Sequence, residues 1–139
     1  MLAALAGGVG AARMLRGLAA VVPPASITAV VNTADDFRLH GLAISPDLDT
    51  VTYTLAGASN PELGWGLEGE TWTVMESLDR YGGQTWFRLG DRDLATHLYR
   101  TQRLLEGAPL SVVTAEITAA WGVGVRLLPM TDDVVETRV

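Results

Sequence analysis

The sequence predicts an α/β fold, with a Rossmann-like parallel sheet flanked by helices in three layers and incomplete within these 139 residues. Two observations carry this prediction. The short apolar run 2–6 leads through a glycine cluster into a helical pattern, and the β-branched apolar run 26–31 comes next. Strands that alternate with helical segments are typical of parallel sheets. We therefore expect a single Rossmann-like domain over residues 1–139.

The first unit consists of a strand over 2–6, a glycine turn and a helix over about 11–21. Glycine has no Cβ, so backbone N–H groups can approach an anion closely, and the helix start adds the positive end of its dipole. The residues expected to hold phosphate are Gly7, Gly8, Gly10 and Ala11. Arg13 stands where the dinucleotide fingerprint has Gly or Ala, so the turn differs from an ordinary NAD site. A tight turn without a ligand is the simpler alternative.

Local patterns predict the remaining elements. Pro23 and Pro24 end the first helix, because proline cannot continue a helix. In chain order we then expect a strand over 26–31, a loop over 32–36, an irregular stretch over 37–44, a helix over 46–56, a turn-rich segment over 57–69, a helix over 70–81, a strand over 85–89, helices over 91–106 and 111–121, a strand over 125–128 and the start of a strand over 134–139. The side chains expected on the apolar face of the 91–106 helix are Leu94, Leu98, Thr101 and Leu105.

Composition limits the function classes. The chain has 48% apolar and 19% charged residues, which is typical of a globular protein. Its formal net charge of −6 argues against nucleic acid as the main partner. Cysteine is absent, so disulfides and thiolate metal sites are excluded. Glycines interrupt the longest apolar runs before they reach membrane length, and no signal-peptide pattern stands at the N-terminus. We therefore expect a soluble cytoplasmic protein with no membrane partner.

Aspartates form four close pairs, at 35/36, 47/49, 91/93 and 132/133. Three of the pairs directly follow a predicted strand, at the sheet edge where parallel α/β proteins bind ligands. Carboxylates that face a phosphate-binding turn repel a phosphorylated ligand, and a divalent cation relieves this repulsion because Mg²⁺ binds one or two carboxylates together with phosphate oxygens. Helix capping at positions 47 and 91, and solvated turns at the other pairs, are the structural alternatives.

The two histidines and four tryptophans are less informative. His97 lies four residues after Asp93 on a predicted helix, so a structural hydrogen bond between them is expected. His40 stands beside Gly41 in a loop, where it either supports the site or lies on the surface. The tryptophans, of which one could stack on a flat ligand, are Trp65, Trp72, Trp86 and Trp121.

A series of motifs extends over nearly the whole chain. They are Gly-Gly-Val-Gly-Ala (7–11), Val-Asn-Thr-Ala-Asp-Asp (31–36), Ser-Pro-Asp-Leu-Asp-Thr-Val-Thr-Tyr-Thr (45–54), Gly-Trp-Gly (64–66), Glu-Thr-Trp (70–72), Leu-Gly-Asp-Arg-Asp-Leu-Ala-Thr-His-Leu (89–98) and Leu-Pro-Met-Thr-Asp-Asp (128–133). In this order they resemble the 2-phospho-L-lactate transferase family, also called phosphoenolpyruvate transferase in actinobacteria. Members of that family are longer, so the chain resembles their N-terminal part.

The resemblance implies an enzyme of coenzyme F420 biosynthesis. Such an enzyme transfers a phospholactyl or phosphoenolpyruvyl group from a guanosine diphosphate-linked donor to the deazaflavin Fo, releases GMP and requires Mg²⁺. Asp49 and Arg92 match the deazaflavin contacts of the family. To these we add Asp36 and Asp47, which with Asp49 are the candidate catalytic groups and magnesium ligands, and Asn32 and Asp132 as supporting substrate contacts. The resemblance also implies a homodimer.

Two other functions compete with this interpretation. A non-enzymatic regulator of the same superfamily would bind a nucleotide-sugar through the glycine turn without needing deazaflavin or a metal. The intact motifs around positions 47–49 and 90–93 count against it. An NAD-dependent dehydrogenase would carry an acidic residue at the end of the second strand, where this chain has Asn32.

Overall fold

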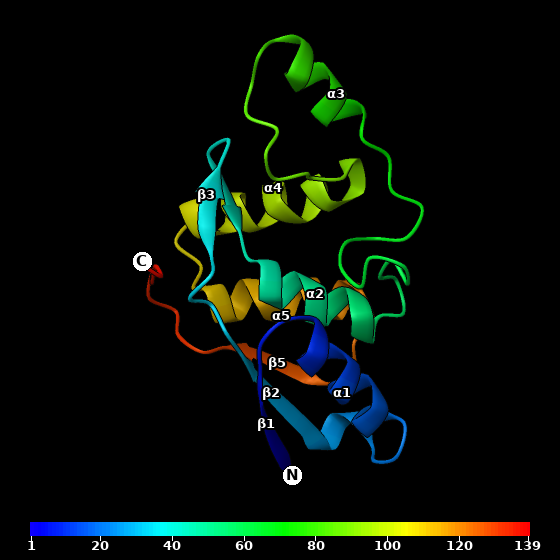
Figure 1. Ribbon diagram of the computed structural model, residues 1–139. Helices are drawn as coiled ribbons and strands as arrows, with labels where there is room; N and C mark the ends of the chain where they lie inside the picture. The colour runs from blue at the N-terminus through cyan, green and yellow to red at the C-terminus, as the bar shows by residue number, and fades with distance from the viewer.

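The computed structural model describes residues 1–139 and has an α/β architecture (Figure 1). Strands β1 (Leu2–Ala6), β2 (Ile27–Val31) and β5 (Arg126–Pro129) form a parallel sheet in the order β1-β2-β5. Leu5 lies opposite Val30, and Val30 lies opposite Leu128. The predicted parallel α/β fold is therefore confirmed.

Five α-helices accompany the sheet. They are α1 (Val9–Ala19), α2 (Pro46–Leu55), α3 (Thr73–Arg80), α4 (Asp91–Leu105) and α5 (Leu110–Ala120), with a short 3₁₀ turn at Pro24–Ser26. The chain crosses the sheet in one direction, from β1 to β2 to β5, and right-handed crossovers then place the connecting helices on one face. No helix combines the length and the hydropathy that a bilayer crossing needs.

The face of the sheet that the helices cover is the main core of the protein. This sheet core consists of Ala6, Ala12, Leu15, Ile27, Ala29, Val31, Leu48, Val51, Leu110, Val125 and Leu127. Side chains alternate along a strand, so the row of Leu5, Val30 and Leu128 points to the opposite face. Leu5 is 86% exposed there, so this face of the sheet is open in this chain.

A second, smaller core lies at the other end of the molecule, where Figure 1 shows a hairpin, α4 and α3 together. The antiparallel hairpin pairs β3 (Phe37–Leu39) with β4 (Leu42–Ile44). This hairpin core consists of Leu39, Ile44, Met75 and Leu89.

The prediction of an irregular stretch over 37–44 is wrong. The hairpin turns through His40, with φ 53°, and Gly41, with φ 75°. Left-handed values at both central residues are those of a two-residue type I′ turn, for which glycine is well suited. His40 is exposed at this turn.

Three other predicted elements differ from the structure. The strand predicted over 85–89 is absent, and these residues are irregular with Trp86 exposed. The strand predicted over 134–139 is also absent; instead Thr137 donates from its backbone N and its Oγ1 to the carbonyl of Ala34. Helix α3 begins at Thr73 rather than at residue 70, because the Glu70 side chain accepts hydrogen bonds from the first turn of α4.

Helix α4 shows the most informative difference between the prediction and the structure. Its predicted apolar face is only half right: Thr101 is buried and Leu94 packs against the hairpin core, but Leu98 is 57% exposed and Leu105 is 78% exposed. Beside Thr101, the buried face holds Thr96, His97 and Arg100. These polar groups have partners inside the protein, as buried polar groups require. Burial of this face brings charged side chains to the boundary between the two cores.

Candidate functional site

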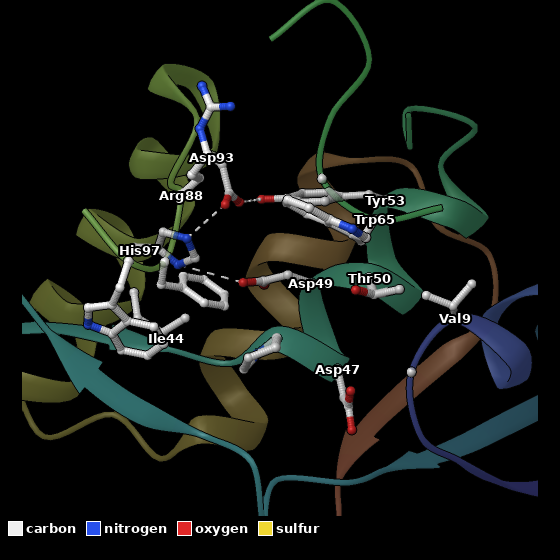
Figure 2. Close-up of a pocket in the computed structure, with 15 residues that line it drawn as sticks. Val9, Ile44, Asp47, Asp49, Thr50, Tyr53, Trp65, Arg88, Asp93 and His97 are labelled. Atoms are coloured by element: carbon white, nitrogen blue, oxygen red, sulfur yellow. Dashed lines mark hydrogen bonds and ion pairs between the residues drawn. The ribbon is translucent and has the colours of Figure 1, made fainter. Parts of the chain in front are cut away.

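A cavity of about 480 Å³ lies between the sheet core and the hairpin core. Its walls come from the glycine turn, α2, the 65–66 and 86–88 loops, and α4 (Figure 2). Its volume is in the range of small-molecule sites. The polar side chains that Figure 2 shows around the cavity are Asp47, Asp49, Tyr53, Arg88, Asp93 and His97.

The glycine turn borders this cavity through Gly8. Gly8 directly precedes α1, no side chain caps this helix, and its first turn holds no acidic residue. A Cβ at Gly8 would lie 3.1 Å from Oδ1 of Asp47, so a larger residue would crowd the first turn of α2. The free N–H groups at the start of α1 therefore remain available to an anion. Gly10 and Ala11 lie inside the first turn of α1.

Asp47 is oriented by the loop that follows β2. Nδ2 of Asn32 donates to Oδ2 of Asp47 at 3.0 Å and to Oδ2 of Asp35 at 3.2 Å. Asn32 comes directly after β2, and Asp47 lies in the first turn of α2. The predicted residues Asn32 and Asp47 thus meet beside the glycine turn.

Asp49 lies deeper, in a buried charged network. Asp49 is 6% exposed, and its Oδ1 accepts a hydrogen bond from Nη2 of Arg100, which is itself 2% exposed. Oδ2 of Asp49 is buried and has no hydrogen-bond partner. Burial raises the pKa of Asp49 above its usual value, although Arg100 and His97 act against this rise. Oδ2 of Asp49 therefore accepts no hydrogen bond, in a residue that lines the cavity.

His97 links Asp49 to Asp93. Its Nε2 lies 2.9 Å from Oδ2 of Asp93, and its Nδ1 lies 3.2 Å from Nη1 of Arg100 and 3.6 Å from Oδ2 of Asp49. Arginine only donates hydrogen bonds, so Nδ1 accepts and Nε2 carries the hydrogen that is donated to Asp93. The expected hydrogen bond between His97 and Asp93 is confirmed.

Tyr53 completes the network from α2. Its hydroxyl donates to Oδ1 of Asp93 at 2.6 Å and lies 2.7 Å from Oγ1 of Thr96. Burial alone would raise the pKa of Asp93, but the hydrogen bonds from His97 and Tyr53 outweigh it and hold this pKa below its usual value. Asp93 is therefore a stable carboxylate, whereas burial makes Asp49 a more basic one.

Asp36 and Asp132 line a different cavity, of about 190 Å³. Oδ2 of Asp36 accepts from the Ser45 hydroxyl at 2.7 Å, and its Oδ1 is buried without a partner. Burial raises the pKa of Asp36 to about 6, against the opposing hydrogen bond from Ser45. Asp132 accepts from the backbone N of Ser111 at 2.7 Å and from its Oγ at 3.0 Å, so it caps α5.

Arg92 lies outside the main cavity. It is exposed, and its Nη1 donates to the carbonyl of Glu68 at 3.0 Å. The arginine that lines the cavity is Arg88, whose guanidinium stacks 4.2 Å from the Trp72 ring. The sequence does not indicate which of the two arginines lines the cavity, because their placement depends on how the irregular 83–90 segment folds.

The carboxylates that converge in space differ from the set chosen from the sequence. Ligand atoms of Asp49, Asp93 and His97 all lie within 4.8 Å of one another, whereas Asp36 and Asp47 are not in that group. Asp93, His97 and Arg100 are spaced by four and three residues on α4. This spacing puts side chains on one helical face and was the signal that could have found the cluster.

Comparison with known proteins supports the relationship that the motifs indicate. The family described as 2-phospho-L-lactate transferase CofD matches residues 2–139. A Streptomyces griseus protein named phosphoenolpyruvate transferase is 59% identical over 97% of this chain and 43% of its own length. A Mycobacterium tuberculosis protein of the same name is 50% identical over 97% of this chain and 45% of its own length.

A solved structure shares the fold. A Bacillus halodurans member of the family named UPF0052 has a TM-score of 0.54 at 18% identity, covering 94% of this chain and 40% of that chain. At this identity the likeness bears on the fold alone. The chain spans about two fifths of the length of the curated relatives it matches.

Proposed function

This chain belongs to the 2-phospho-L-lactate transferase CofD family, and on that basis we propose that the protein transfers a phospholactyl or phosphoenolpyruvyl group to the deazaflavin Fo. The donor is a guanosine diphosphate-linked compound, the product belongs to coenzyme F420 biosynthesis, and GMP is released. The names of the relatives favour a phosphoenolpyruvyl group over a phospholactyl group. The observation that carries the proposal is one cavity lined both by the glycine turn and by Asp49, whose Oδ2 accepts no hydrogen bond.

The donor diphosphate is assigned to the glycine turn. The N-terminus of α1 offers unpaired N–H groups and the positive end of the helix dipole. Gly8 keeps the approach open, since it has no side chain between the turn and Asp47. Asn32 holds Asp47 by one of its carboxylate oxygens, and this fixes the wall against which the diphosphate would lie.

The acceptor hydroxyl is assigned to Asp49. In the proposed reaction the hydroxyl oxygen attacks the phosphorus that carries the three-carbon acid, a new O–P bond forms, and the bond from that phosphorus to the GMP oxygen breaks. Oδ2 of Asp49 accepts the proton of the hydroxyl, a role that its raised pKa favours. Arg100 holds the other oxygen, so the carboxylate cannot turn away from the cavity.

Magnesium fits this arrangement. Asp47 and Asp49 lie in the first turn of α2 and both line the cavity, and Oδ2 of Asp49 is an unpartnered buried oxygen. Mg²⁺ binds one or two carboxylates, water and phosphate oxygens, so Asp47 would hold it beside the diphosphate and leave Oδ2 of Asp49 to the acceptor hydroxyl. When bound, the ion neutralises charge on the diphosphate. Asp36 would act from the neighbouring cavity, and Arg92 from outside the main cavity.

The test is the substitution Asp49→Asn in the full-length protein. Asparagine keeps an oxygen that can face Arg100 but cannot take a proton, so we expect transfer to Fo to fall at least about a hundredfold. Asp79→Asn on the exposed surface of α3 is the matched control and should transfer at the parent rate. Circular dichroism checks that both variants are folded. Near-normal turnover by folded Asp49→Asn protein would refute the assignment of Asp49.

A binding experiment separates this function from that of a nucleotide-sugar regulator. Calorimetric titration with GDP and with Fo, each with and without Mg²⁺, should give heat for both ligands. A UDP-sugar and NAD serve as controls. If the folded protein binds the UDP-sugar and does not bind Fo, the result would favour a nucleotide-sugar regulator.

A further inference from the structure

Trp65 differs from the other three tryptophans in having no ring or cation against it. The pairs formed by the others are Trp72 with Arg88 at 4.2 Å, Trp86 with Phe37 at 5.8 Å and Trp121 with Tyr53 at 5.5 Å. Trp65 forms no such pair and is 41% exposed, yet it lines the main cavity. Figure 2 shows its ring at the cavity wall, on the side where Tyr53 lies.

The loop around Trp65 is built to hold it in one place. Its neighbours Gly64 and Gly66 have φ values of 74° and 71°, a left-handed conformation that glycine adopts without strain. Backbone hydrogen bonds join Asn60 N to Gly66 O at 3.0 Å and Gly64 N to Asn60 O at 2.9 Å. The Asn60 side chain adds two more bonds, from the backbone N of the second and third residues after it.

This loop is also packed against the start of α1. A Cβ at Gly64 would lie 3.2 Å from Cγ1 of Val9, so the two segments touch. Val9 follows the glycine turn directly, and Trp65 lines the same cavity as that turn and Asp49. An ordered loop that holds a partly exposed indole over a cavity provides a flat apolar surface for a ligand.

We infer that Trp65 is the stacking surface for a planar aromatic heterocycle bound in the main cavity. The inference rests on the proposed function, which supplies two such rings, the deazaflavin of the acceptor and the guanine of the donor. Aromatic faces gain energy from offset stacking, and large aromatic side chains do so at small entropic cost. Trp65 is thus a binding residue that fixes the plane of one ring relative to Asp49.

The test measures binding of Fo, GDP and inorganic pyrophosphate by calorimetry and by quenching of tryptophan fluorescence. Trp65→Leu should weaken binding of one ring-bearing ligand about 5- to 100-fold, the range found for stacked bases. Trp65→Phe should recover most of that affinity because a ring remains. Tyr81→Leu, at an 84% exposed aromatic outside the cavity, is the matched control. Pyrophosphate has no ring, so its affinity should not change in any variant.

The outcomes show which ligand ring contacts Trp65, and they distinguish failure of this inference from failure of the proposed function. A loss confined to Fo assigns Trp65 to the acceptor ring, and a loss confined to GDP assigns it to the guanine. Unchanged affinity for both ligands in Trp65→Leu overturns the inference while the proposed function stands. An equal loss for pyrophosphate also overturns it, because the effect would then be structural. If the folded parent protein binds neither Fo nor GDP, the proposed function itself fails.

Discussion

Removal of the positive charge from Arg100 should destabilise the protein in a pH-dependent way. The substitution Arg100→Met keeps the aliphatic volume but leaves the Asp49 carboxylate buried without its cation. Loss of one partner from a buried ion pair costs about 3–5 kcal/mol. A domain of this size is stable by roughly 5–15 kcal/mol, so this is a large share of the total. The carbonyl of Ala43 also loses the hydrogen bond that Nη1 donates at 3.1 Å.

The sign of the pH dependence follows from Asp49. Its pKa in the folded protein is raised by burial, and removal of Arg100 raises it further, whereas in the unfolded chain it is ordinary. When the pKa of a carboxyl group is higher in the folded protein than in the unfolded chain, the free energy of unfolding falls as the pH rises from the unfolded pKa to the folded pKa. The cost of Arg100→Met should therefore be larger at about pH 8 than at about pH 5, because uptake of a proton by Asp49 at lower pH relieves the buried charge.

Urea unfolding followed by circular dichroism measures this effect at both pH values. The double variant Asp49→Asn with Arg100→Met should recover part of the lost stability at the higher pH, since no charge is then buried. The two single variants complete a double-mutant cycle. A loss below about 1 kcal/mol, or an equal loss at both pH values, would refute the view that Asp49 is a buried anion neutralised by Arg100.

Three other predictions follow from contacts described above. Burial raises the pKa of Asp36 to about 6, so the buried ionised form of Asp36 destabilises the protein above that pH. Asp36→Asn should therefore raise the urea midpoint at about pH 8 and leave it unchanged at about pH 4. Equal midpoints for the variant and the parent at the higher pH would contradict this. A Cβ at Gly90 would lie 2.0 Å from Cγ of Glu70, so Gly90→Ala should expel the carboxylate that caps α4 and cost about 1–2 kcal/mol in urea unfolding; full additivity with Glu70→Ala would rule out this shared mechanism. Gly8→Ala should weaken GDP binding about tenfold in calorimetry, because the new Cβ crowds the first turn of α2. The control is Gly17→Ala, which has open space around the new Cβ and should bind GDP as the parent does.

Local sequence patterns were enough to predict the part of the site that lies next to the parallel sheet. The apolar run of β1, the glycine turn and the start of α2 each depend on neighbouring residues, and all three lie where the sequence placed them. Helix α1 begins at Val9, slightly earlier than predicted, because glycine does not by itself prevent a helical first turn. Asn32 and Asp47 meet because both lie at the carboxyl edge of the sheet.

The other side of the site depends on contacts between distant residues. His97 and Arg100 face inward because Asp49 and the hairpin provide their partners, and those partners lie about fifty residues away along the chain. Periodicity ranks leucine above arginine for burial, so it selected the exposed Leu98 and Leu105 together with the buried Thr101 and missed His97 and Arg100. The hairpin was missed because its strands have three residues each, too few for a clear alternation.

The open face of the sheet also affects how the chain behaves at high concentration. Strand β1 lies at one edge and consists only of leucine and alanine, with neither a charge nor a proline to discourage another strand from pairing with it. Strand β5 lies at the other edge and contains both Arg126 and Pro129. Self-association of this chain should therefore begin at β1, and a lysine substituted for the exposed Leu5 would oppose aggregation without disturbing the buried side of the sheet.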